Sequence, residues 1–166
     1  MKYLAFDEGD IRIYKGEGSV TFIAYYPYAL AVNESKVPSV SGNNIYALLS
    51  NIGDLDAPLK FYFGVSSTSK NFTITLKDNM VGNDEVYGLM TFKNLKAIGN
   101  DEYVCIDTQT NLIEGLIKDS SGNYIKTGNL YNYALTAGDF FKLPVGSFYV
   151  YSNISWEEII YVNRYY

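Results

Sequence analysis

Clustered carboxylates are the first residues of this chain that could carry chemistry. Three groups could supply oxygen ligands to Ca²⁺, which binds carboxylate and carbonyl oxygens. They are Asp54 with Asp56, Asp101 with Glu102, and Asp119. Their spacing does not match a calcium loop of the EF-hand type, and Asp is also a common turn residue. We therefore expect turns at these positions and no metal site.

A pair of carboxylates could also cleave a glycosidic bond, one as acid and the other as base or nucleophile. Glu157 and Glu158 are the only adjacent Glu pair in the chain. If both lie in a strand, they point to opposite faces and cannot converge on one substrate. The chain contains no histidine, so the commonest general base is missing as well. The sequence thus predicts no catalytic residues and no cofactor, and the protein is not expected to be an enzyme.

The net charge and the lack of long apolar runs exclude some classes of partner, and the single cysteine is predicted from its neighbours to be buried. The net charge of −5 argues against nucleic-acid binding and against attraction to anionic lipids. No apolar run is long enough to span a membrane, and acidic residues near the N-terminus argue against a signal peptide. Cys105 stands between Val104 and Ile106, which predicts a buried thiol.

Aromatic residues are the remaining candidates for binding. Aromatics make up 16% of the chain, so some of them are available for surfaces as well as for a core. Tyr149 and Tyr151 share one face of a predicted strand, and the segment that follows carries Trp156 and Tyr161. Such rings can stack on sugars or contact a protein partner, although packing is their commoner use. These four residues are the candidate glycan or partner contacts.

Alternation of apolar and polar residues indicates the elements that hold these side chains. It is clearest at 59–63 and 72–76, and further strand candidates are 45–50, 86–92, 102–106, 112–118, 124–126, 147–152 and 156–163. Many short strands separated by turns are typical of a sandwich or a jelly roll. We expect an all-β fold, an antiparallel β-sandwich or jelly roll with little or no helix. Its predicted core includes Phe61, Phe63, Phe72, Ile74, Leu76 and Cys105.

A proline and a glycine separate two apolar segments in the stretch GDFFKLPVGSFYVYS, which runs from Gly138 to Ser152. Pro144 fixes φ at the first corner of a type I or II turn, and Gly146 can take a positive φ two residues later. The stretch therefore predicts a turn that reverses the chain before its last two strands.

Four separated segments, that turn among them, resemble the distal tail proteins of long-tailed bacteriophages. They are YKGEGSVTFIAYYPYAL (14–30), NIGDLDAPLKFYF (51–63), DEYVCIDT (101–108) and FFKLPVGSFYVYS (140–152), and they occur in the order found in that family. One departure is Phe148, which stands where the family usually has an Asn two residues after the turn glycine. A second departure is that most of the family's N-terminal ring-forming domain has no counterpart.

The resemblance implies three parts. Residues 1–30 would hold the last β-hairpin of the ring domain. Residues 31–43, which are small and polar, would form a linker. Residues 44–166 would form the C-terminal domain, a galectin-like or carbohydrate-binding-module-like sandwich.

The resemblance also implies a structural component of a bacteriophage or prophage tail tip or baseplate, made in the bacterial cytoplasm and located in the virion. Its expected partners are tail-tube, tail-associated and receptor-binding proteins. A homo-oligomer and carbohydrate are left open as further partners, while nucleic acid and membranes are not expected. The alternative function is a carbohydrate-binding module that recognises a host-surface glycan.

Overall fold

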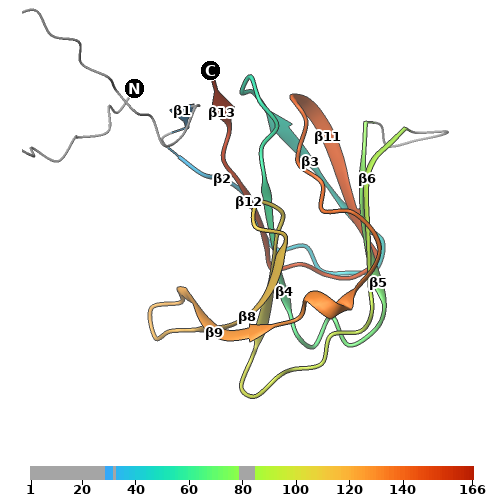
Figure 1. The fold of residues 1–166 in the computed structure, drawn as a ribbon, viewed down its shortest axis with the longest axis vertical. Helices are drawn as coiled ribbons and strands as arrows, with labels where there is room; N and C mark the ends of the chain where they lie inside the picture. The colour runs from blue at the N-terminus through green and yellow to red at the C-terminus, as the bar shows by residue number, and fades with distance from the viewer. Residues whose placement is uncertain (1–28, 32, 79–84) are drawn as a thin grey trace, which may run out of the picture.

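The chain folds into two antiparallel β-sheets that face each other across an apolar core (Figure 1). The computed structural model describes residues 29–31, 33–78 and 85–166. Its one helical element in these ranges is the 3-10 turn η1 (Asn132–Ala134), and no helix there is long and apolar enough to cross a membrane. The predicted all-β sandwich with little helix is confirmed. The β-hairpin predicted within residues 1–30 was expected over 11–25, and that range lies outside the described residues.

One sheet has five strands in the order β10–β6–β5–β11–β3. They are β3 (Ile45–Asn51), β5 (Phe72–Lys77), β6 (Val86–Phe92), β10 (Leu135–Gly138) and β11 (Gly146–Ser152). The central strand β5 therefore pairs with β6 on one side and with β11 on the other. Strands β3 and β10 are the edges of this sheet, and β11, which carries Phe148, Tyr149 and Tyr151, pairs with the edge strand β3.

The other sheet has six strands in the order β2–β12–β4–β7–β8–β9. They are β2 (Ser35–Val37), β4 (Leu59–Gly64), β7 (Tyr103–Asp107), β8 (Leu112–Lys118), β9 (Tyr124–Leu130) and β12 (Glu158–Tyr161). A separate two-stranded sheet joins β1 (Ala29–Leu30) to β13 (Arg164–Tyr165).

The inward faces of the two sheets fill the core with large side chains. Phe72 is 1% exposed, and its ring lies 4.7 Å from that of Phe92 in the same sheet and 5.3 Å from that of Phe63 in the other. Ile74 and Leu76 follow it on the same face of β5 and are fully buried. This pattern confirms the alternation expected for 59–63 and 72–76.

Cys105 is buried, as predicted, but it does not line the core between the sheets. Val104 and Ile106 belong to that core, and consecutive residues of a strand point to opposite faces. In register Cys105 lies opposite Tyr62 on β4 and Glu114 on β8, on the outer face of the six-stranded sheet. The prediction identified a covered thiol and assigned it to the wrong face.

The buried Cys105 thiol should be unreactive in the folded protein. Burial, together with the nearby Asp107 carboxylate, raises the pKa of Cys105 to about 12. Since the thiolate is the reactive form, native protein at pH 8 is expected to leave Ellman's reagent unreacted, whereas protein unfolded in guanidinium releases one equivalent of chromophore. A rapid stoichiometric reaction of the native protein would show that the outer face is open at this strand.

The stretch 31–43, expected as a linker, is attached to the sandwich over its described residues. Strand β2 pairs with β12 and forms an edge of the six-stranded sheet. The indole Nε1 of Trp156 donates to the carbonyl oxygen of Pro38 at 3.1 Å, and the Val40 amide donates to the Trp156 carbonyl at 3.3 Å. A short edge strand followed by a loop has the same small, polar composition as a linker.

The chain bends at Val145, between Pro144 and Gly146, and enters β11, whose first residue is Gly146. Gly146 has a φ of +118°, a region that favours glycine. Phe148, which departs from the family pattern, is 8% exposed and packs in the core. This bend is held from other segments instead, because the side-chain Nδ2 of Asn51 donates to the Leu143 carbonyl at 3.1 Å and Leu143 forms a β-bridge with Ala57.

Candidate functional site

Two of the four aromatic residues predicted as contacts are buried. Trp156 is 1% exposed and its indole N–H is bonded to the Pro38 carbonyl. Tyr161 is 7% exposed, and its hydroxyl donates to the carbonyl of Ser50 and accepts from the Ser50 amide, both at 3.1 Å. Neither ring is accessible to a sugar or to a partner protein. Both side chains hold the fold together, and Tyr161 does so by joining β12 to β3 in the opposite sheet.

The other two predicted contacts lie together on the outer face of the five-stranded sheet. Tyr149 and Tyr151 project from β11, and Tyr46 of the neighbouring strand β3 lies against both. The ring centroids of Tyr46 are 6.3 Å from Tyr149 and 5.9 Å from Tyr151, and those of Tyr149 and Tyr151 are 6.5 Å apart. Sequence alternation alone could not reveal Tyr46, because only the pairing of β3 with β11 brings it there.

Two exposed leucines lie on the same side of this sheet as the three tyrosines. Leu48 of β3 is 54% exposed, Leu89 of β6 is 41% exposed, and Tyr46 is 49% exposed. We define the tyrosine face as the surface formed by Tyr46, Leu48, Leu89, Tyr149 and Tyr151. These residues lie on three strands of one sheet, and β5, which stands between β6 and β11, adds Thr75 and Lys77 to the same side, opposite Tyr151 and Tyr149. The face is therefore mainly aromatic and aliphatic.

The two sheets differ sharply in charge. Taken together, the five strands of the five-stranded sheet contain a single charged residue, Lys77 of β5. Its Nζ lies 5.4 Å from the centre of the Tyr151 ring. The strands of the six-stranded sheet contain seven: Lys36, Lys60, Asp107, Glu114, Lys118, Lys126 and Glu158. Charged residues are depleted from the centres of protein interfaces, where tyrosine is enriched. The tyrosine face has that composition.

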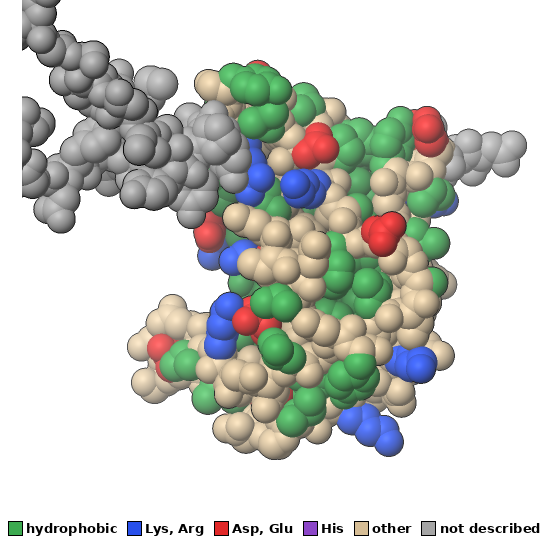
Figure 2. Space-filling view, in the orientation of Figure 1, with side chains coloured by type: hydrophobic (Ala, Val, Ile, Leu, Met, Phe, Trp, Pro, Cys, Tyr) green, Lys and Arg blue, Asp and Glu red, His purple; other side chains and the backbone are tan. Residues whose placement is uncertain are grey.

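A hollow of about 480 Å³ lies on the outer side of the six-stranded sheet, between the β8–β9 turn and strands β2 and β12. Figure 2 shows that the surface is concave between the projecting β8–β9 hairpin and the part of the molecule above it. We define the polar groove by its lining residues: Lys36, Ser39, Lys118, Gly122, Asn123, Tyr124, Glu157, Glu158 and Ile160. Its volume is in the range of small-molecule sites.

A cluster of tyrosines supports one wall of the polar groove. The ring of Tyr124 stacks on Tyr62 at 4.5 Å and meets the ring of Tyr103 edge-on at 5.3 Å. The Lys118 Nζ lies 4.5 Å from the Tyr103 centroid and 4.8 Å from that of Tyr124. Because β7 and β8 separate β4 from β9, the contact between Tyr62 and Tyr124 means that the hairpin bends over the sheet.

Both stacked phenols stay protonated at neutral pH. Burial raises the pKa of Tyr124, Lys118 opposes that rise, and Glu157 and Glu158 add to it. Burial also raises the pKa of Tyr62, and the adjacent Cys105 raises it further. The effect of both glutamates on Tyr124 places negative charge opposite this wall of the groove.

Glu157 and Glu158 line the same groove, which corrects the expectation that they point apart. That expectation assumed that both residues belong to one strand. Strand β12 begins at Glu158, so Glu157 stands just before it and is not bound by strand alternation. The amide of Glu157 instead donates to the Tyr62 carbonyl at 2.8 Å.

Two of the other carboxylates, Asp101 and Asp119, hold loops in place. Asp101 is 5% exposed and accepts from the hydroxyl of Tyr131 at 2.6 Å and from the side-chain Nδ2 of Asn129 at 3.0 Å. Asp119 accepts from two turn amides, that of Asn123 at 2.8 Å among them, and hydrogen bonds from Asn123 lower the pKa of Asp119. Within the described ranges, no group of three or more His, Cys, Asp and Glu side chains could hold a metal ion.

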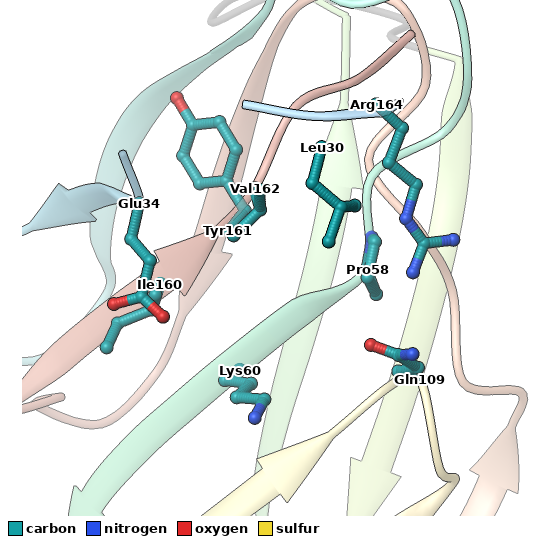
Figure 3. Close-up of a pocket in the computed structure, with 9 residues that line it drawn as sticks. All are labelled: Leu30, Glu34, Pro58, Lys60, Gln109, Ile160, Tyr161, Val162 and Arg164. Atoms are coloured by element: carbon teal, nitrogen blue, oxygen red, sulfur yellow. The ribbon is translucent and has the colours of Figure 1, made fainter. Parts of the chain in front are cut away.

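A smaller hollow of about 260 Å³ lies beside the two-stranded sheet. Figure 3 shows the Arg164 side chain extending toward Gln109, with Leu30 and Pro58 between it and Tyr161. Comparison with protein-family models, with curated proteins and with solved structures finds no match.

Proposed function

We propose that this chain is a structural component of a bacteriophage or prophage tail tip or baseplate that acts through protein–protein surfaces in tail assembly and host attachment. The observation that carries the proposal is the tyrosine face, an aromatic surface on a sheet whose strands contain a single charged residue, Lys77. Contiguous exposed apolar patches on soluble proteins mark interaction sites. The proposal assigns the chain no catalytic step.

The resemblance to distal tail proteins supports the same proposal from the sequence. The resembling segment 140–152 contains the bend between Pro144 and Gly146 and continues into β11, the strand that carries Tyr149 and Tyr151. The segment through which the chain resembles that family therefore also supplies the centre of the tyrosine face. The expected occupant of the face is another tail protein with an apolar, weakly charged surface, since such a surface leaves no charge unpaired on binding.

Charge placed on the tyrosine face should block tail assembly without unfolding the protein. Leu48→Glu is the chosen change, because the side chain is 54% exposed and its loss from the monomer costs little. A buried, unpaired carboxylate at an interface is expected to reduce incorporation into tails by about tenfold or more. The measurement is the ratio of this chain to tail-tube protein, by mass spectrometry, in tails purified from the strain that encodes it.

The matched control is Tyr133→Glu, which places the same charge on η1, at a residue that is 68% exposed and outside the tyrosine face. This variant should be incorporated like the wild type. The proposal fails if Leu48→Glu is incorporated normally, or if the wild-type chain is missing from purified tails.

A further inference from the structure

We propose that the polar groove is a binding site for a neutral oligosaccharide. This site is separate from the tyrosine face, lies on the opposite sheet and does not depend on the role in tail assembly. It also differs from the aromatic residues by which the sequence suggested glycan binding, because Trp156 and Tyr161 are buried and Tyr149 and Tyr151 lie on the five-stranded sheet.

The charges of the groove favour a ligand that is polar and neutral. Its lining contains two ammonium groups, on Lys36 and Lys118, and two carboxylates, on Glu157 and Glu158, so their net charge is zero. An anionic ligand would leave the two carboxylates desolvated without a partner, and a cationic ligand would do the same to the two ammonium groups. Burying an unpaired charge is costly. Hydroxyl groups both donate and accept, and they form strengthened hydrogen bonds with charged partners of either sign.

The remaining lining residues complete the character of a saccharide site. The hydroxyl of Ser39 and the amide of Asn123 add neutral donors and acceptors, while Ile160 and the Tyr124 ring add apolar contacts. A pyranose ring presents hydroxyls at its edge and C–H groups on its faces, and it needs both kinds of partner. A hollow of about 480 Å³ has room for on the order of two to three such rings.

The walls of the groove are held in place before any ligand arrives. Tyr124 is fixed by its stacking on Tyr62 and by the cation of Lys118. The β8–β9 turn is fixed by Asp119, whose carboxylate accepts from the backbone and the side-chain amide of Asn123. On the opposite wall the Lys36 Nζ lies 3.8 Å from the Glu158 carboxylate. Such preorganisation lowers the entropy that binding would otherwise cost.

The test uses the full chain and four neutral tetrasaccharides: maltotetraose, cellotetraose, chitotetraose and β-1,4-galactotetraose. Saturation-transfer NMR detects binding, and calorimetry measures the dissociation constant. At least one of the four should bind at millimolar or lower concentration. A sulfated heparin tetrasaccharide should bind at least about tenfold more weakly than the best neutral one.

Glu157→Gln is the decisive variant, because it keeps the shape of the side chain and removes a charged acceptor. It should weaken binding of that tetrasaccharide by about tenfold. The matched control is Glu114→Gln on the same sheet, whose carboxylate is paired with Lys126 and lies outside the groove. The control should bind like the wild type.

Three results would overturn the assignment. The first is that none of the four tetrasaccharides binds at millimolar concentration. The second is that the heparin fragment binds as tightly as the neutral sugars. The third is that Tyr149→Ala abolishes binding while Glu157→Gln has no effect, which would place the sugar on the tyrosine face.

Discussion

Replacing Phe72 by alanine is expected to lower the free energy of unfolding by about 3 to 5 kcal/mol. The side chain is fully enclosed and its ring contacts Phe92 in its own sheet and Phe63 in the opposite sheet. Truncation therefore removes buried apolar surface and leaves a cavity at the junction of both sheets, which packed neighbours cannot fill completely. Equilibrium denaturation in urea, followed by tyrosine and tryptophan fluorescence, measures the loss.

Thr75→Ala is the matched control for this change. Thr75 lies on the same strand, at the same register as Tyr151, and its side chain faces outward and is half-buried. Its truncation should cost less than about 1 kcal/mol, as partly exposed positions do. Equal denaturation midpoints for Phe72→Ala and Thr75→Ala would mean that the assignment of the two faces of β5 is wrong.

Replacing Trp156 by alanine is expected to cost about 3 to 5 kcal/mol as well. Trp156 is among the largest fully buried side chains in the described part of the chain, and its indole N–H satisfies the Pro38 carbonyl. The truncation should therefore also loosen the contact between the 33–43 segment and β12. Thermal and urea denaturation of the variant measure both effects, the second as a change in the cooperativity of unfolding.

This variant separates the structural role of Trp156 from the surface role that its residue type suggested. If Trp156 were an exposed contact, alanine would leave stability unchanged and abolish binding of a partner or a sugar. Tyr46→Ala serves as the comparison, since Tyr46 is 49% exposed on the tyrosine face and its truncation should cost about 1 kcal/mol or less. A Trp156→Ala protein as stable as Tyr46→Ala would contradict the burial described above.

Local alternation was enough to predict most strands of the two sheets. The segments 86–92 and 112–118 coincide with β6 and β8, and 59–63 and 72–76 fall one residue short of β4 and β5. The prediction for β9 ended at residue 126, whereas the strand continues to Leu130. Gly128, with a φ of +88°, and a register shift against β8 interrupt the alternation there, so periodicity could not reveal the second half.

Alternation does not say which face of a strand is covered, and the errors follow from this. Cys105 stands between two apolar residues and Trp156 between Ser155 and Glu157, and only the neighbouring strands decide that Cys105 is on the outer face and Trp156 is inside. The polar groove could not be predicted at all. Its walls come from Lys36, Tyr124 and Glu157, which are distant in sequence and are brought together by the strand order and by the bend of the β8–β9 hairpin.

The tyrosine face was half predicted for the same reason. Tyr149 and Tyr151 are two residues apart in one strand, so their spacing alone predicts that they share a face. The residues that make them into a broad surface, Tyr46 and Leu48, come from a strand about a hundred residues earlier, paired in register with them. The low charge of these strands, with Lys77 as their single charged residue, was visible in each segment, but its significance for a surface depended on those segments joining one sheet.

Site-specific photo-crosslinking tests the central claim, that the tyrosine face docks onto another tail protein, most directly. The photoreactive amino acid p-benzoylphenylalanine replaces Tyr46 in one variant and Tyr133 in another, and tails assembled in the encoding strain are irradiated. Both positions are exposed, at 49% and 68%, so the replacement should leave the fold intact. We expect position 46 to form a covalent adduct with a tail-tube, tail-associated or receptor-binding protein, identified by mass spectrometry, and position 133 to form none. Adducts of equal yield from both positions, or no adduct to a tail protein from position 46, would contradict the claim.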